Sequence, residues 1–271
     1  MTIKRTSCHI LLLALLLGLV SCQTGPRIVT VQKAVARDLV PSDNGWVENE
    51  EYVQPSTYSA SVVTRGGGFK LPNDGENFQG TDRGIAKTKP AVTPARNIEF
   101  SQLLLEFQPG EQKSDDNMRM HHEPAMSKDF HFDRVPEEDD NVEVEGWIIA
   151  THKENDNDFH IILATDPGII DEASPDRWKL MNVEVSGLPP KGTTGRESLV
   201  TTREEFKSVF LPAVPDSATK NYTYVKPIHV RIVGSIFFDV DHAPGAVGPD
   251  QFKPMTSWEI HPMTSLEFLN N

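Results

Sequence analysis

Acidic and imidazole side chains are the groups in this sequence whose types and spacing could do chemistry. Six of them form the candidate site: His160, Asp239, Asp241, His242, Glu259 and His261. The last five stand at the two ends of one long polar stretch, where they could converge. Imidazole nitrogens and carboxylate oxygens bind divalent metals such as zinc, and they also transfer protons.

Three interpretations of these residues remain open. A histidine–aspartate hydrogen bond could pin the ends of a long loop, because buried polar groups need partners and charge-assisted bonds are the stronger ones. The three histidines with Asp239 or Asp241 could instead hold a divalent metal, zinc being the example we consider. A ligand groove is the third, in which His and Trp side chains stack on bases or sugars. We prefer the first interpretation, the structural hydrogen bond, because the sequence has no His-x3-His pair of the kind that marks a metal site on a helix.

The elements that must position these residues follow from hydrophobic periodicity. Residues 142–150 alternate apolar and polar side chains, as in a half-buried strand, and Gly146 marks a bend or bulge. Residues 159–164 and 178–185 indicate two further strands. A capping-box pattern predicts a helix that opens at Thr201 or Thr202, buries Phe206, Val209 and Phe210, and ends at Pro212. The fourth and fifth strands lie within residues 228–268, with Ile236 and Phe238 facing inward and Glu259 and His261 opposite Trp258 and Ile260.

This order of three strands, a helix and two strands resembles the OB-fold. The fold expectation is therefore mainly β: a five-stranded OB-like barrel with one helix between strands three and four, preceded by a disordered tether. The resemblance implies that the first and last loops flank one binding face, on which the candidate residues would meet. Trp258-Glu259-Ile260-His261-Pro262 is also similar to a strand of certain exported bacterial proteins, a group that brings no activity to carry over.

The start of the chain predicts export. Lys4 and Arg5 precede an apolar run, Ile10 to Val20, which is too short to span a bilayer. The run ends in Leu19-Val20-Ser21-Cys22, which resembles the lipobox of bacterial lipoproteins. The resemblance implies cleavage before Cys22 and lipidation of its thiol with a diacylglycerol, whose acyl chains, palmitate for example, anchor the chain in the membrane. Because Gln23 rather than aspartate follows Cys22, the same resemblance favours the outer over the inner membrane.

Composition divides the chain into four parts. Residues 1–21 are the lipoprotein signal peptide, and residues 22–96, rich in Pro, Gly, Ser and Asn, are a flexible linker. Residues 97–140 are an extension that the sequence assigns neither to the linker nor to the barrel, although residues 98–107 form a short apolar helix or strand. Residues 141–271 are the OB-like domain.

Charge and cysteine content exclude several classes of function. The formal charge of −13 becomes −15 once the signal removes Lys4 and Arg5, which disfavours nucleic acid as a partner. The only cysteines are Cys8 and Cys22, so the mature chain has no thiol for catalysis or metal binding. Nucleophile-elbow, P-loop and dinucleotide-binding glycine motifs are absent.

The sequence thus favours a cell-envelope lipoprotein with an OB-like binding or interaction domain, whose partner is an envelope protein or a small ligand. The alternative is a metal-dependent hydrolase that uses the His/Asp cluster at the barrel rim, with the ion activating a water. The sequence does not decide whether the protein is an enzyme.

Overall fold

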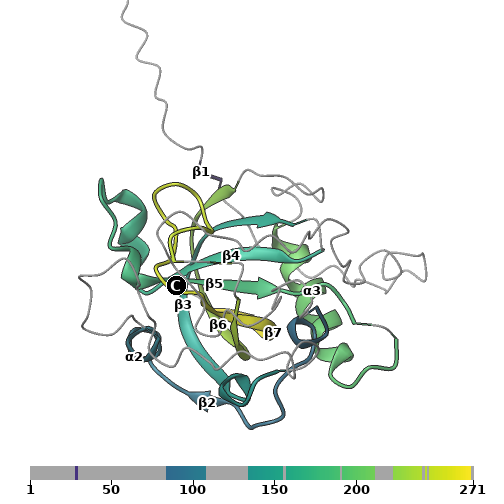
Figure 1. Cartoon of the computed structure of the whole chain (residues 1–271). Coiled ribbons are helices and arrows are strands. Elements are labelled where there is room, and N and C mark those ends of the chain that lie inside the picture. Colours follow the sequence, from purple (N-terminus) through teal and green to yellow (C-terminus); the bar gives the residue numbers. More distant parts are fainter. Residues whose placement is uncertain are drawn as a thin grey trace, which may run out of the picture.

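The computed structural model describes residues 28–29, 84–107, 134–154, 157–189, 191–210, 222–239, 242 and 244–269. These residues form a mixed α/β fold in which helices flank one strongly bent sheet (Figure 1). Residue Cys22 and the lipobox lie outside the described residues, as does Asp241. Within the described ranges, no helix is long and apolar enough to cross a membrane.

Five strands of the sheet close into a ring. They are β3 (Asn141–Lys153), β4 (Phe159–Ala164), β5 (Leu180–Val185), β6 (Thr223–Phe238) and β7 (Trp258–Phe268). Around the ring the order is β3, β4, β5, β7, β6 and back to β3. All neighbours are antiparallel except β5 and β7, which are parallel. Two short strands, β1 (Ile28–Val29) and β2 (Arg96–Asn97), pair in parallel with β6 and β3.

Apolar side chains from all five strands fill the inside of the ring. Because successive strand residues point to opposite faces, every second residue contributes. On β4 these are Phe159, Ile161 and Leu163, and on β7 they are Trp258 and Ile260. Ile236 and Phe238 of β6, which the sequence predicted to face inward, belong to the same core. The alternate residues of β4, β5 and β7 therefore point out of the ring, where the candidate site lies.

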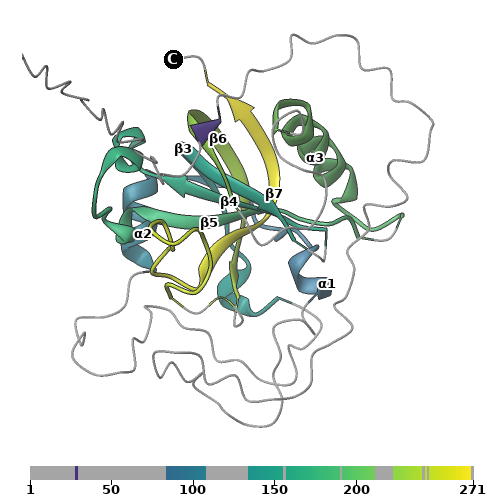
Figure 2. The same ribbon diagram turned by 90° about the horizontal axis from the view of Figure 1, so that it is seen from above.

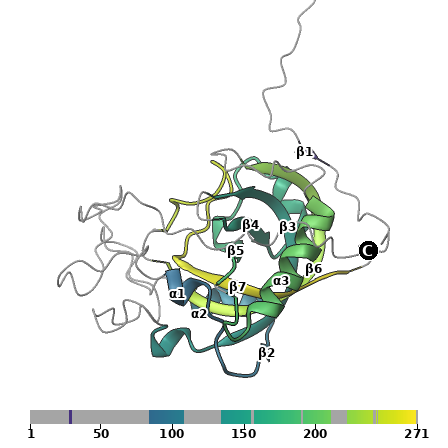
Figure 3. The same cartoon turned by 90° about the vertical axis from the view of Figure 1, so that its right-hand side faces the viewer.

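Helices cover two sides of the ring. The longest, α3 (Arg196–Phe210), joins β5 to β6 and lies in front of β7 in Figure 3; its Phe206 ring is 5.0 Å from that of Phe159. Helix α2 (Phe100–Glu106) lies on the other side of the strands in Figure 2 and buries Phe100, Leu103 and Leu104. Shorter helical turns complete the fold: α1 (Gly84–Lys87), η3 (Pro136–Glu138), η4 (Pro167–Asp171) and η5 (Arg177–Lys179).

The helix before β6 begins earlier than the sequence predicted. It starts at Arg196, directly after Gly195, whose positive φ of 82° suits glycine. The capping-box pattern is not used, because the Thr201 hydroxyl lies inside the helix and donates to the carbonyl of Glu197. The earlier start adds Leu199 to the buried face.

The bulge of β3 also differs from the prediction. The register shifts between Ile148 and Ala150, not at Gly146. Gly146 serves close packing instead, since a Cβ there would lie 2.9 Å from the Leu163 side chain. Beyond the shift, Ile149 and Ala150 join a second, smaller apolar cluster with Leu180.

Residues 84–96, which the sequence assigned to the flexible linker, lie against the ring. Arg134 holds them there, because its guanidinium donates to the carbonyls of Ala86 and Lys89 and also to those of Ile236 and His261. The extension is likewise part of the folded unit where it is described, since β2 pairs with β3 and α2 enters the core. The described residues before 141 therefore belong to the same folded unit as the ring, and they include Ile28 and Val29 of β1, which the sequence also assigned to the linker.

Candidate functional site

The candidate residues meet on the outer face of β4, β5 and β7. His160, Glu184 and His261 point away from the core there, and each is at most 3% exposed. His160 and Glu184 are directly paired across β4 and β5. The connection from β6 to β7 covers this face, since Phe252 packs on the outward residues Ile162, Ala164 and Leu180.

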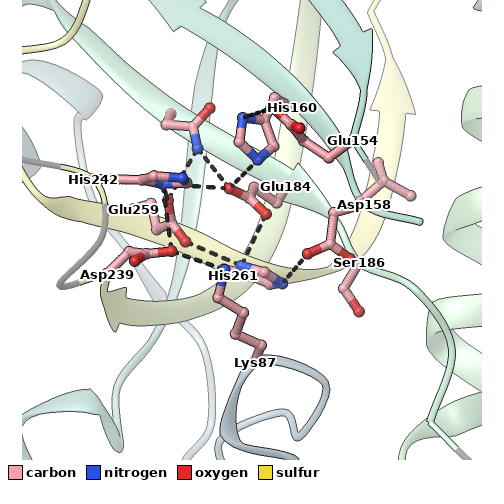
Figure 4. Close-up of polar contacts among 12 residues, drawn as sticks. Lys87, Glu154, Asp158, His160, Glu184, Ser186, Asp239, His242, Glu259 and His261 are labelled. Atoms are coloured by element: carbon pink, nitrogen blue, oxygen red, sulfur yellow. Dashed lines mark hydrogen bonds and ion pairs between the residues drawn. The ribbon is translucent and has the colours of Figure 1, made fainter. Parts of the chain in front are cut away.

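Glu184 is the centre of the cluster. Its Oε1 lies 2.8 Å from His160 Nε2 and 3.8 Å from His242 Nδ1. Its Oε2 lies 3.1 Å from His261 Nδ1 (Figure 4). One fully buried carboxylate therefore reaches ring nitrogens of all three predicted histidines. A shared ligand or ion among them is geometrically feasible.

A second buried carboxylate, Glu259, runs beside the first. Its Oε1 lies 3.0 Å from His261 Nδ1 and its Oε2 lies 3.1 Å from His242 Nδ1. The amide of Asn182 joins the two acids, donating to Glu184 at 2.7 Å and to Glu259 at 2.9 Å. The two carboxylates are thus held at fixed separation by one amide and two imidazoles.

Asp239 joins the cluster to the loop and to α1. Its Oδ2 lies 2.8 Å from Lys87 Nζ and 3.4 Å from His242 Nδ1. Its backbone N–H donates to the carbonyl of Ser257 at 2.9 Å, so the two ends of the β6–β7 connection are tied together. The histidine–aspartate contact of the structural interpretation is present, but it is one contact within a larger network.

An outer group of side chains adjoins the cluster at the start of β4. His152 Nε2 lies 2.9 Å from Glu154 Oε1, and His160 Nδ1 lies 3.6 Å from the same oxygen. The His152 ring stacks on Tyr222 with centroids 3.9 Å apart. Glu154 is the more accessible member, with about a third of its side chain exposed (34%).

On the inner side, Asp158 approaches His261. Its Oδ2 lies 3.6 Å from His261 Nε2, and its other oxygen accepts a hydrogen bond from the N–H of Gly187. Both residues are 0% exposed. Four buried carboxylates, Asp158, Glu184, Asp239 and Glu259, therefore share this small region with the histidines and Lys87. Buried carboxylates in such number favour bound positive charge.

The electrostatics of the cluster separate its groups. Burial raises the pKa of Glu184, and the charge of Glu259 adds to this, bringing it to about 7. Burial acts to raise the pKa of Asp239 as well, but His242 and Lys87 outweigh it and lower the value to about 2. Burial also acts to raise the pKa of Glu259, but hydrogen bonds from His242 and His261 hold it well below its usual value.

The two histidines of the central group differ in charge. Burial lowers the pKa of His160 to about 3, so its ring is neutral at pH 7 and has a lone pair to offer. Burial acts to lower the pKa of His242, but the Asp239 and Glu259 carboxylates outweigh it and raise the value to about 10. A metal that took His242 as a ligand would therefore have to displace a proton.

Among the described residues, four groups of three side chains have ligand atoms within 4.8 Å of one another and could hold a metal ion. The central group is His160, Glu184 and His242. Each of its members also belongs to one of the other three, which are His152–Glu154–His160, Asp158–Glu184–His261 and Asp239–His242–Glu259. The central group is thus the point at which the others meet, and it is a set of two imidazoles and one carboxylate.

Several functional side chains were missed by sequence reasoning. Five of the six residues predicted from the sequence lie in this cluster. The sixth, Asp241, lies outside the described residues. The missed residues are Lys87, His152, Glu154, Asp158, Asn182 and Glu184. A signal was present for two of them, because Asn182 and Glu184 alternate with Met181 and Val183 on a strand whose every residue is buried. Trp258 is not available to stack on a ligand, since it packs in the core against Phe107 and Phe238.

Comparisons with protein-family models, with curated proteins and with solved structures found no match to this chain. The geometry of the site therefore carries the functional argument alone.

Proposed function

We propose that this protein is a lipid-anchored protein of the bacterial cell envelope whose ring domain is OB-like and binds a divalent metal ion. Three features support the OB-like assignment: the strand order around the ring, the position of α3 between the third and fourth ring strands, and a site flanked by the first and last loops. We take these as support for the fold type and argue the function from the site itself.

One observation carries the metal-binding proposal. The buried Glu184 carboxylate lies within 4 Å of ring nitrogens of His160, His242 and His261. Moving charged groups from water into such a buried cluster costs free energy unless a cation or a full set of hydrogen bonds compensates. Imidazole nitrogen and carboxylate oxygen together suit zinc, so zinc is the ion we assign first.

The chain's own residues would hold the ion as follows. Nε2 of His160, the Glu184 carboxylate and a ring nitrogen of His242 are the ligands. Asn182 and Glu259 orient them, because the Asn182 amide holds the Glu184 carboxylate and Glu259 accepts from His242. Since all but His242 are at most 4% exposed, the ion's role is binding and stabilisation of the β6–β7 connection rather than open-access catalysis.

Anchoring is the other half of the proposal. Lipidation at Cys22 would tether the domain to the membrane, with the outer membrane favoured. The strongly acidic chain supports an envelope protein or a small ligand as the partner rather than nucleic acid. Replacing Cys22 by Ser should abolish labelling of the protein by radioactive palmitate in cells; retained labelling would refute the anchor.

Metal binding is tested on the full chain carrying Cys22→Ser, stripped with EDTA and reloaded with zinc. Zinc should raise the thermal unfolding midpoint of this protein and of a His229→Ala control, whose histidine lies on the exposed face of β6. The same addition should leave Glu184→Gln and His242→Ala unshifted. Equal zinc shifts in all four proteins would reject the site, and no shift in any of them would reject metal binding.

A metal-dependent hydrolase is the second candidate function. It is favoured by the ligand set, because two imidazoles and a carboxylate leave coordination positions for water, and by His242, whose side chain is 17% exposed. The test is hydrolysis of a model phosphodiester and a model ester by the zinc-loaded chain. Activity that is lost in Glu184→Gln and kept in His229→Ala would establish it. Zinc-loaded protein without activity on either model substrate would count against it.

A further inference from the structure

The two ring nitrogens of His160 face two different groups of ligands. Nε2 lies 2.8 Å from Glu184 Oε1, in the central group. Nδ1 points to the outer group, 3.6 Å from Glu154 Oε1 and 3.4 Å from the hydroxyl of Tyr222. One imidazole thus stands between two sets of metal-ligating atoms, with one nitrogen available to each.

The outer group is built on paired strands rather than on loops alone. His152 lies directly opposite His160 in the antiparallel pairing of β3 and β4. The hydroxyl of Thr151 donates to the carbonyl of His160 at 2.7 Å, and the Tyr222 ring stacks on His152, which orients both imidazoles. Glu154 follows β3 at once, and its N–H donates to the carbonyl of Asp158 at 2.8 Å. Its carboxylate is 2.9 Å from His152 Nε2.

We propose that His152, Glu154 and Nδ1 of His160 form a second divalent metal site, and that the His160 imidazole bridges it to the ion held by His160 Nε2, Glu184 and His242. The inference rests on the proposed function, because the bridge needs an ion in the central group. Neutral imidazole carries one N–H, so coordination of both ring nitrogens releases that one proton to solvent. Metal–nitrogen bonds take the place of that N–H bond, and an ion held by His242 displaces one ring proton of His242 to solvent as well.

The shared ligand couples the two sites. An ion on one nitrogen withdraws electron density from the ring and repels an ion on the other, so the second ion binds more weakly than the first. The sites also differ in access, because Glu154 is 34% exposed whereas Glu184 is fully buried. The outer ion should therefore exchange faster and be removed first by a chelator.

Copper(II) is the probe for the bridge, since it accepts imidazole and carboxylate ligands and is paramagnetic. The full chain with Cys22→Ser is loaded with copper(II), and bound copper is measured after gel filtration. Because His121 and His122 lie outside the described residues, the stoichiometry is compared between variants. His152→Ala and Glu154→Gln should each bind one ion fewer than the wild type, and His229→Ala should bind the same number. Glu154→Gln is the safer of the two, because its side chain is partly exposed and the amide keeps its shape.

Electron paramagnetic resonance then tests whether the imidazole bridges. Two copper(II) ions on one imidazolate couple magnetically, so the wild-type signal should account for fewer spins than the copper bound. In Glu154→Gln, the ion in the central group has no neighbour on the same imidazole, so the signal should account for all of the copper bound.

The outcomes separate this inference from the proposed function. If Glu184→Gln loses an ion while His152→Ala and Glu154→Gln lose none, the second site is wrong and the central site stands. If no variant loses an ion, both are wrong. If both sites load but every copper gives an uncoupled signal, the sites exist and the bridge does not.

Discussion

Two outer faces of the same ring carry histidines, carboxylates and cationic groups, but under opposite conditions. On β4, β5 and β7, Glu184, Glu259 and His261 are covered and at most 1% exposed. On β3, β6 and β7, Arg231 stands in solvent between Glu145 at 2.6 Å and Glu267 at 2.7 Å, with side chains 37%, 47% and 58% exposed. The hydrogen-bond lengths are similar on both faces, and only the covering differs.

The two faces differ in the free energy that is lost when one charged group is removed. Water and salt screen the exposed ion pairs, so either partner can be lost with little consequence. Under the β6–β7 connection each charge has given up its hydration, so it depends on the partners the cluster supplies. The candidate site is therefore distinguished from the open face by the burial of its side chains and by their convergence. The residue types alone do not distinguish the two faces.

The largest effect should follow removal of His261, whose ring nitrogens lie within 3.6 Å of three buried carboxylates, those of Asp158, Glu184 and Glu259. His261→Ala removes the imidazole between these carboxylates and leaves buried acceptors without a partner, which costs about 1–3 kcal/mol for each group. Urea unfolding at pH 7 in EDTA measures the free energy of unfolding. The matched control is His229→Ala on the open face, where the side chain is 26% exposed and its ring stacks on Trp147, so a smaller loss is expected. Comparable losses in the two variants would erase the distinction between the faces.

The next effect concerns Lys87 at the edge of the cluster. Lys87→Met removes the ammonium from Asp239, which keeps His242 as a partner, so we expect a loss of about 2 kcal/mol, as for a hydrogen bond to a charged group. Exposed Lys89→Met is the control. Urea unfolding that failed to separate these two lysines would show that α1 contributes nothing to the buried face.

A pH experiment sharpens the role of Glu184. Its pKa is raised by burial and by Glu259 from 4.5 to about 7, so its contribution to stability is fully present below pH 4.5 and is lost as the pH rises through 7. The amide in Glu184→Gln does not titrate. In EDTA, the free energy of unfolding of the wild type should therefore fall relative to that of the variant as the pH rises from 4.5 to 7. A difference that is constant over this range would contradict the raised pKa.

The smallest effect belongs to the open face. Arg231→Ala removes the cation between Glu145 and Glu267, and the urea midpoint should move only slightly at about 0.1 M salt and not at all at about 1 M salt. The effect of His261→Ala should persist at both salt concentrations. An Arg231 effect that survived high salt would mean that this face is less exposed than its side chains indicate.

Much of the fold was predictable from the sequence, because alternation of apolar and polar residues is a local signal. It located β4 at its observed bounds and turned Ile236 and Phe238 toward the core. The start of α3 was missed because Thr201 and Glu204 have the spacing of a capping box, although both residues lie inside the helix. The helix begins instead after Gly195, whose positive φ suits glycine, and the earlier start buries Leu199.

The site was only partly predictable, for a physical reason. His242 and His261 stand out because they are polar groups at strand ends. Glu184 carries a weaker signal, the alternation of Asn182 and Glu184 with apolar residues, and its contacts depend on β7, which is a parallel neighbour far along the chain. Lys87 was missed for a similar reason. Its position depends on Arg134, which is distant in the sequence and donates hydrogen bonds to the backbone carbonyls of residues 86 and 89.

The place of β7 in the ring has a consequence for how the molecule is made. Strand β7 lies between β5 and β6, so the ring cannot close until residues 258–268 have been synthesised. Contacts between distant residues are slow to form, since a long loop must close before they are gained. A chain truncated before residue 258 would lack Glu259 and His261 and would leave the unpaired edges of two strands open to aggregation. The cluster can therefore assemble only after β7 has joined the ring.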